Sequence, residues 1–401
     1  MKPRWQTLWI MFAIQVVGSL TFLTLTVLTP FVKGDFGVST TEIGLLVTLL
    51  YAGYFSSVTT GGIVTDYAGE RFALGVGLAL IGSISFLLSV LPTFWTVATG
   101  AYVVGLGYGT VPSGTNKGIF DWFPADQRTI GISIKQTGVM LGGAAGAAFL
   151  PAIASVFGWR TAVRVVAATT ILMLGTIYLY SPKTEPSGRR VPSATRVLDQ
   201  HRRILRLAAT RDVFPFLISG VLFGATQFTL MAYIVLYLTE SLLFAPAIAG
   251  LVYTGMQLMG MGSRIGFGFL TDSYFAGSKH LVLAGIGIVG FVFYLPLLVL
   301  SPETEFSVAL VVLLCVGAVS LGYNGVYLTM ASEVMDGDEA GTGTAIGVAA
   351  IMIGAVVSPP IVGVVIDATG GYGVPLATLG FVTLLAGIAA FFGVKGGEKA
   401  A

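Results

Sequence analysis

The stretch that decides the fold is GGIVTDYAGER, residues 61–71, which lies between two long apolar runs. It carries two glycines, an acid and a base at fixed spacing: Gly62, Asp66, Gly69 and Arg71. A second stretch, GFGFLTDSYFAGSK at residues 266–279, repeats the first part of the pattern as Gly268-x-x-x-Asp272, 206 positions later. Each Asp alone could simply end a helix before a turn, but the recurrence indicates an internal repeat.

Further matches at nearly the same distance extend the repeat along the chain. Two glycine pairs are 212 positions apart and an aromatic pair is 213 apart: Gly131 with Gly343, Gly142 with Gly354, and Trp159 with Tyr372. Separate matches at nearly one spacing predict two homologous halves of six helices each.

The composition places the chain in a membrane. Of its 401 residues, 55% are hydrophobic and 10% are charged, whereas a soluble domain carries about 25% charged residues. Together with a net charge of +2, this excludes a soluble enzyme, a disordered chain and a nucleic-acid binder. One cysteine and two histidines exclude a disulfide framework and multi-cysteine metal sites, so we expect neither a metal nor a cofactor.

Twelve apolar runs are long enough to approach or exceed the roughly 20 residues that cross a bilayer. They are residues 7–31, 43–65, 72–91, 94–119, 129–153, 160–181, 213–239, 246–271, 280–300, 306–332, 341–366 and 374–394. We therefore predict an all-α membrane protein with twelve transmembrane helices in two pseudo-symmetric six-helix bundles. The bundles are residues 1–181 and 213–401, joined by a cytoplasmic linker at residues 182–212.

The basic residues predict the orientation. With a cytoplasmic N-terminus, 15 of the 21 Lys and Arg fall in cytoplasmic segments, three fall outside and three lie within spans, which satisfies the positive-inside rule. Eight of them lie in the linker, where residues 197–208 indicate a short amphipathic helix on anionic lipid. A regulatory lipid site is the alternative there. We expect a multi-pass protein of the cytoplasmic membrane with both termini in the cytoplasm.

The stretch 61–71, with the repeat and the basic linker, resembles the signature loop of the major facilitator superfamily of secondary transporters. Glu70 stands where that family usually has a basic residue, and Ser273 and Phe275 depart from the pattern in the second copy. The resemblance implies the major facilitator fold. It also implies that the loop residues are gating residues rather than substrate ligands: Gly62, Asp66, Gly69, Arg71, Gly268 and Asp272.

Three cations lie within the predicted spans, whereas every Asp and Glu lies at a helix end or in a loop. Counted at 1.5 Å per residue, Lys117, Lys135 and Arg264 are each about 10–12 Å from the cytoplasmic end of their helices. Charged residues at such a depth mark functional sites. Three cations at one level without an interior carboxylate predict that the protein binds an anion.

Each cation also has an ordinary explanation. Lys117 lies one helical turn before Asp121 and could pair with it. Lys135 has no acid three or four positions away and could be a neutral amine instead. Arg264 stays charged, so its burial would require an anionic or strongly polar partner.

The pattern Arg264-x-x-x-Gly268-x-x-x-Asp272 resembles the eighth-span arginine of oxalate/formate exchangers, monocarboxylate carriers and nitrate/nitrite carriers. That resemblance implies that Arg264 binds the anion. The segment GISIKQTGV at residues 131–139 is similar to cyanate-type carriers. The second cation of these carriers is not at its usual place here, which leaves the identity of the anion open.

Polar side chains within the spans could complete a binding site. They are Gln15, Asn116, Gln136, Gln227, Gln257, Tyr323, Asn324 and Tyr327. An interhelical hydrogen bond is the alternative role for each of them taken singly.

These features predict a secondary transporter that moves a small anion, a mono- or dicarboxylate, across the cytoplasmic membrane by alternating access. Arg264 would bind the carboxylate, and Lys135, with or without Lys117, would supply a second charge. The alternative is a drug or anionic-lipid exporter of the same fold. Anion exchange, uniport and symport with a proton carried by a lysine all remain open. We expect a monomer in the lipid bilayer that is not an enzyme.

Overall fold

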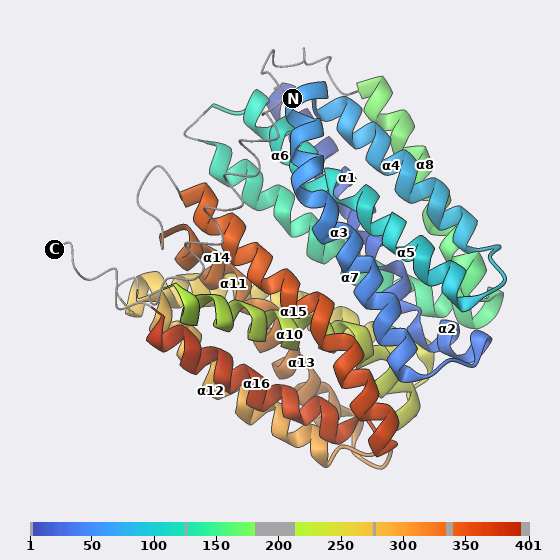
Figure 1. Ribbon diagram of the computed structural model, residues 1–401, viewed down its shortest axis with the longest axis vertical. Helices are drawn as coiled ribbons and strands as arrows, with labels where there is room; N and C mark the ends of the chain where they lie inside the picture. The colour runs from blue at the N-terminus through green and yellow to red at the C-terminus, as the bar shows by residue number, and fades with distance from the viewer. Residues whose placement is uncertain (1–2, 125–126, 181–212, 276–277, 334–339, 394–401) are drawn as a thin grey trace. The chain divides into compact units, whose positions relative to one another are not determined.

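The computed structural model describes residues 3–124, 127–180, 213–275, 278–333 and 340–393. Its elements are helices, and the described residues contain no β-strand (Figure 1). The predicted all-α membrane fold is confirmed. The predicted linker at residues 182–212, with its amphipathic helix at 197–208, lies outside the described residues, and the predicted domain boundaries stay predictions.

The described chain divides into two compact units. Unit 1 contains α1 to α8 and the first residues of α11, up to Thr254, whereas unit 2 contains α10, the rest of α11 from Gly255, and the helices that follow. The helices of unit 1 are α1 (Pro3–Val27), α2 (Thr29–Phe36), α3 (Thr40–Ala68), α4 (Glu70–Leu88), α5 (Phe94–Tyr108), α6 (Thr110–Trp122), α7 (Arg128–Phe157) and α8 (Trp159–Tyr180). The elements of unit 2 are α10 (Phe214–Leu236), the π-helical turn η2 (Tyr237–Ser241), α11 (Pro246–Tyr274), α12 (Lys279–Tyr294), the 3-10 turn η3 (Leu295–Leu298), α13 (Phe306–Gly322), α14 (Asn324–Glu333), α15 (Ala340–Thr369) and α16 (Gly373–Phe392).

Each of the twelve predicted spans coincides with one helix or with two consecutive helices. Ten helical stretches of the described chain are long and apolar enough to cross a membrane. The two spans outside that set are the pair α5–α6, which is divided at Gly109, and α11. α11 is one continuous helix of 29 residues, but its six glycines, Gln257 and Arg264 lower its mean hydropathy. It therefore differs from the others in composition and not in length.

The first predicted span, residues 7–31, forms two helices rather than one. α1 ends at Val27 and α2 begins at Thr29, with a proline in the first turn of α2. Pro30 has no N–H to donate to the preceding turn, and its ring crowds the carbonyl four residues earlier. The helix therefore breaks just before it.

The signature stretch forms a tight turn between α3 and α4. Gly69 has φ 85° and ψ 160°, a conformation open almost only to glycine. Its N–H donates to the carbonyl of Thr65 at 3.0 Å, which closes α3. At the other end of α3, Ser39 and Glu42 form a capping box, in which each side chain accepts from the backbone N–H of the other residue.

The internal repeat extends to the packing of the helices. α1 packs on α7 in unit 1, and α10 packs on α15 in unit 2. Gly142 and Gly354 make these contacts possible, because a side-chain carbon at either would collide with the backbone of the facing helix. The backbone atoms met are those of Val16 and Leu20 in α1 and of Val221 and Ala225 in α10. In this packing, which we call the packing register, each residue of α1 corresponds to the residue of α10 that lies 205 positions later in the chain. Each residue of α7 corresponds to the residue of α15 that lies 212 positions later.

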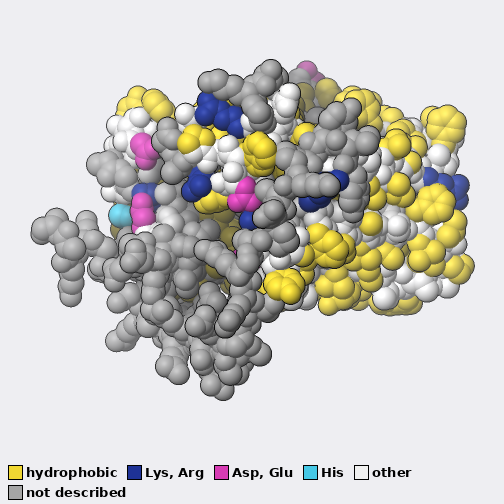
Figure 2. Space-filling view, turned by 90° about the horizontal axis from the view of Figure 1, so that it is seen from above, with side chains coloured by type: hydrophobic (Ala, Val, Ile, Leu, Met, Phe, Trp, Pro, Cys, Tyr) yellow, Lys and Arg dark blue, Asp and Glu magenta, His cyan; other side chains and the backbone are white. Residues whose placement is uncertain are grey.

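The described surface is largely apolar. In the view of Figure 2, hydrophobic side chains cover wide areas and the charged side chains form small groups. Large apolar side chains point outward from long helices of both units, including Leu172 and Ile265, which are 75% and 71% exposed. Such an exterior suits hydrocarbon rather than water as the surrounding solvent.

Candidate functional site

Lys135 lies in the interior of unit 1. It projects from α7 and its side chain is 0% exposed. Its Nζ donates a hydrogen bond of 3.4 Å to Oε1 of Gln15 on α1. The two residues are 120 positions apart in the chain, so this contact could not be predicted from local spacing.

Gln15 is the centre of a buried polar network. Its Oε1 also accepts from the hydroxyl of Thr115 on α6 at 3.1 Å. Its Nε2 donates to the hydroxyls of Ser19 at 3.2 Å and Tyr108 at 3.1 Å, and these two hydroxyls are 2.8 Å apart. The amide oxygen thus faces two donors and the amide nitrogen faces two hydroxyl oxygens, which fixes the orientation of the amide.

All partners in this network are neutral. An ammonium group has three N–H donors, and within the described residues Lys135 has one acceptor and no carboxylate partner. Burying a charge without an opposite charge is expensive, commonly several kcal/mol. A negatively charged ligand would supply the missing charge.

Lys117 has a different environment. Its Nζ pairs with Oδ2 of Asp121 at 3.0 Å, one turn further along α6, and both side chains are partly exposed. This is the pairing that the spacing offered as an alternative to substrate binding. The neighbouring Asn116 has a buried Oδ1 with no hydrogen-bond partner in the described part of the chain. Gln136 is exposed, whereas Lys135 beside it is buried, because successive residues of a helix point about 100° apart.

Arg264 is the corresponding cation of unit 2. It lies on α11, is half-buried, and its Nε donates to the carbonyl oxygen of Leu321 at 2.9 Å. That carbonyl belongs to the last turn of α13, just before the chain starts α14. Among the described residues Arg264 has no carboxylate partner. With Nε occupied, both Nη groups are left to bind a ligand as a fork.

Two tyrosines lie where α13 gives way to α14 and pack on α10. The ring of Tyr323 stacks on Phe223 at 4.6 Å, and the ring of Tyr327 stacks on Phe216 at 4.6 Å. The hydroxyl of Tyr327 donates to the carbonyl of Phe216 at 3.4 Å. The hydroxyl of Tyr323 is buried and lies near the side chains of Asn324 and Arg264.

The remaining predicted residues of unit 2 lie around this region. Gln227 on α10 is 6% exposed; its Nε2 approaches Sδ of Met231 at 4.0 Å, and its Oε1 has no partner in the described chain. Gln257 is buried in α11, and Asn324 begins α14 and is half-buried.

Several polar residues of these regions were missed by sequence reasoning. They are Ser19, Tyr108 and Thr115 in unit 1 and Ser219 in unit 2. A usable signal existed for Ser19, because it lies one helical turn after Gln15. The hydroxyl of Ser219 is fully buried without a partner in the described residues, and a lone serine in an apolar run gives no such signal.

The two units differ where Lys135 and Gln15 lie. By the packing register, Gln15 corresponds to Gly220, and Lys135 corresponds to Gly347. Tyr327 fills that space in unit 2: a side-chain carbon at either glycine would meet its ring or its hydroxyl. The buried amine is therefore a feature of unit 1 and not of the repeat.

The predicted gating residues lie at the ends of their helices. Asp66 is exposed near the end of α3, and Arg71 is half-buried in the first turn of α4. Gly268 and the exposed Asp272 lie toward the end of α11. Of the first motif, Gly62 lies in α3 with open space beside it, and Gly69 makes the turn. Their gating role stays a prediction.

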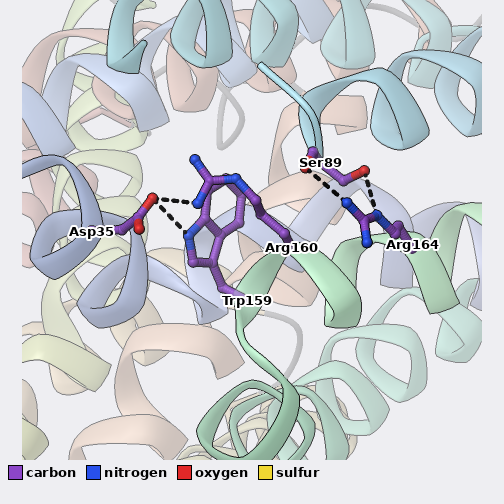
Figure 3. Close-up of polar contacts among 5 residues, drawn as sticks. All are labelled: Asp35, Ser89, Trp159, Arg160 and Arg164. Carbon is purple, nitrogen blue, oxygen red and sulfur yellow. Dashed lines mark hydrogen bonds and ion pairs between the residues drawn. The ribbon is translucent and has the colours of Figure 1, made fainter. Parts of the chain in front are cut away.

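A second polar cluster ties together α2, α4 and α8 (Figure 3). The carboxylate of Asp35 accepts from Nε1 of Trp159 at 3.3 Å and pairs with Nη1 of Arg160 at 2.5 Å. Arg164, one turn along α8, donates from Nε to the hydroxyl of Ser89 at 3.0 Å. These arginines are cations that the sequence placed outside the membrane.

Unit 2 contains a counterpart of the aromatic contact. The hydroxyl of Tyr372 donates to Oε2 of Glu240 at 2.7 Å. Tyr372 matches Trp159 at 213 positions, and Glu240 matches Asp35 at 205. Each half thus joins an aromatic residue at the start of its last helix to an acid that follows its first long helix.

Comparison with known proteins places these features in a family. The profile described as Major Facilitator Superfamily matches residues 10–349. The chain is 26% identical over 177 residues to the hexuronate transporter of Bacillus subtilis, a match that covers 44% of this chain and 41% of that protein. It is 23% identical over 406 residues to the probable sulfoacetate transporter SauU of Cupriavidus necator, covering 98% and 94% of the two chains. The solved structure of the nucleoside transporter NupG matches with a TM-score of 0.77 at 14% identity, over 95% of this chain and 98% of that one, which shows the fold.

Proposed function

The chain belongs to the Major Facilitator Superfamily, and from that premise we propose that it is a secondary transporter of a small organic anion with a carboxylate group. It moves this anion across the cytoplasmic membrane by alternating access. Both chain termini lie in the cytoplasm, as the distribution of Lys and Arg indicates.

The observation that carries the proposal is that Lys135 and Arg264 each have a neutral oxygen, and no carboxylate, as hydrogen-bond partner in the described residues. One cation comes from each unit. A cation in a low-dielectric interior is stabilised by a negative charge nearby. A bound carboxylate ligand supplies that negative charge, so no acidic side chain of the protein is needed beside the cation.

The two cations suit different parts of an anion. Arg264 is oriented by its hydrogen bond to Leu321, so its two Nη groups can bind both oxygens of one carboxylate. Lys135 is a point charge with two unused N–H donors and accepts a carboxylate, sulfonate or phosphate oxygen without a preferred plane. The relatives named for hexuronate and sulfoacetate are named for organic anions with a carboxylate, which supports this class.

Gating is assigned to the turn between α3 and α4. Asp66 and Arg71 lie on opposite sides of Gly69, which holds the two helix ends in a fixed turn. We propose that they act as gating residues in one of the transport states, with Gly268 and Asp272 as the second copy. Asn116, Gln136, Gln257 and Asn324 remain proposed substrate-binding residues of lower rank than the two cations.

The test is binding by purified protein in detergent. Propionate, succinate, glucuronate, sulfoacetate, nitrate and cyanate are screened for thermal stabilisation, since a ligand that binds the folded state raises its melting temperature. We expect organic carboxylates to stabilise the wild type, and Arg264→Lys and Lys135→Gln to weaken binding about tenfold or more.

Lys279→Gln is the matched control, because it also removes a positive charge but one that pairs with Glu333 at 2.9 Å. Equal stabilisation of Arg264→Lys, Lys135→Gln and wild type would show that the two cations are not the site. Stabilisation by lipids or cationic drugs alone would contradict the anion proposal itself.

A further inference from the structure

Two buried polar atoms of α10 have no hydrogen-bond partner in the described residues. They are Oγ of Ser219 and Oε1 of Gln227, on side chains that are 0% and 6% exposed. Most buried polar atoms in native proteins are paired, so two on one helix indicate a ligand that supplies a missing partner.

These residues lie on facing surfaces of two helices. Ser219, Phe223 and Gln227 are spaced by four along α10 and therefore share one face. The ring of Phe223 stacks on Tyr323, which brings the phenol ring of Tyr323 to that face. Gln227 lies one turn beyond Phe223, about 6 Å along the helix.

Arg264 belongs to the same neighbourhood. Its Nε donates to the carbonyl of Leu321, two residues before Tyr323, and it lies near Tyr323. The phenol of Tyr323 thus lies near Arg264 of α11 and against the face of α10 that carries Gln227. All three belong to unit 2.

The hydrogen-bonding type of Gln227 restricts the ligand. Its Nε2 is directed to Sδ of Met231 at 4.0 Å, so the unpaired atom is the amide oxygen, which can only accept. Nitrate, cyanate and unsubstituted carboxylates have no hydrogen to donate. A hydroxyl group donates one hydrogen and accepts others, so it can serve Gln227 and Tyr323 together.

The corresponding atom of Gln15, the buried glutamine of unit 1, does have hydrogen-bond donors. Oε1 of Gln15 accepts from Lys135 and Thr115, and its Nε2 is bonded twice. The amide oxygen of Gln227 has no such donor among the described residues. This difference between the two glutamines points to a donor that the substrate brings.

We infer that the transported anion is a hydroxylated carboxylate, bound through its carboxylate by Arg264 and through a hydroxyl by Gln227 and Tyr323. This rests on the proposed function and narrows it from organic anions in general to hydroxy acids. It adds Gln227 and Tyr323 as the residues that decide between a hydroxy acid and its deoxy analogue.

Two series of anions matched in charge and carbon number test the inference. They are propionate, lactate and glycerate, and succinate, malate and tartrate. Binding to the full-length purified protein is measured by thermal stabilisation at several concentrations. We expect the dissociation constant to fall along at least one series, with about tenfold or more between its ends, because a site with an unpaired acceptor rejects the analogue that lacks the donor.

Two variants assign the preference to its residues. Gln227→Leu should bring the dissociation constants at the two ends of the series to within about twofold of each other. Tyr323→Phe keeps the ring on Phe223 and removes the hydroxyl alone, so it should reduce the preference even if Gln227→Leu does not fold. Thr226→Val is the control, because the hydroxyl of Thr226 is already bonded to Leu222 and Thr383, and it should keep the preference.

The outcomes separate the two proposals. Equal binding along both series by the wild type would overturn the hydroxy-acid inference and leave the anion transporter standing, as would a preference that survives both Gln227→Leu and Tyr323→Phe. If no member of either series raises the melting temperature of the wild type, and Arg264→Gln melts at the same temperature as the wild type with and without each anion, the proposed function fails. This inference then fails with it.

Discussion

The hydroxyl of Tyr327 occupies the space beside Gly220, so that a side-chain carbon at residue 220 would collide with it. Tyr327 also stacks on Phe216 and donates to its carbonyl. The glycine therefore leaves room for the side chain of Tyr327, in the first turn of α14, to lie against α10. At the equivalent place in unit 1, Gln15 supplies a side chain of its own, and the network around Lys135 forms instead.

Gly220→Ala should destabilise the protein by about 1–3 kcal/mol, because added volume in a packed interior forces side chains or backbone to move. The measurement is the thermal midpoint of the purified protein in detergent. Gly262→Ala on α11 is the control, since nothing lies within 4 Å of its added carbon and alanine is the better helix former. A Gly220→Ala protein as stable as Gly262→Ala would contradict the close contact with Tyr327.

Lys135→Met should stabilise the empty protein, on the order of 1 kcal/mol, and at the same time abolish stabilisation by anions. An apolar side chain of similar length replaces a buried charge that has only neutral partners. Thermal midpoints with and without anion give both effects. Lys117→Met is the comparison: it breaks the ion pair with Asp121 and should not raise the midpoint. A lower midpoint for Lys135→Met without anion would mean that its charge is already compensated.

Asp35→Asn should lower stability by no more than about 1 kcal/mol. The ion pair with Arg160 is close, but the side chains are 37% and 31% exposed, so water and salt weaken it. The loss should shrink as NaCl is raised. A double-mutant cycle with Arg160→Gln measures the coupling, and Arg164→Gln, which loses the bond to Ser89 instead, should show no coupling to Asp35. A loss independent of salt would assign the effect to the Trp159 contact.

Gly69→Ala should destabilise the protein by about 1–3 kcal/mol, because its φ of 85° and ψ of 160° are open almost only to glycine. Gly62→Ala, in the same motif but inside α3 with no neighbour within 4 Å, should be neutral or slightly stabilising. Chemical or thermal denaturation of the two variants separates a conformational need for glycine from a need for space. Equal stability of both variants would show that the turn can be rebuilt without glycine.

Much of the fold could be predicted from the sequence because the bilayer allows few solutions. Apolar runs of sufficient length must be helices there, and the glycine pair Gly142 and Gly354 already indicated the repeat. The break between α1 and α2 was missed, although Pro30 marks it, because the apolar run continues across it.

The site was predictable where it is local and hidden where it is not. The pair Lys117–Asp121 follows from a spacing of four, and the structure contains it. The partner of Lys135 is 120 positions away, so only the tertiary packing reveals it. The missing partner of Gln227 is hidden for the same reason, because an unpaired atom is a property of everything packed around it and not of its own neighbours in the chain.

α11 has a consequence for how the protein enters its membrane. Glycines and polar side chains, Arg264 among them, make it less apolar than the ten helices that suffice by length and composition. Lipid alone would hold such a segment weakly, so its insertion depends on neighbouring helices that are already present or arrive with it. A topology that omitted α11 alone would place every later loop on the wrong side of the membrane. Arg264, which is proposed to bind the substrate carboxylate, is thus also among the residues that make the insertion of α11 depend on the other helices of the second half.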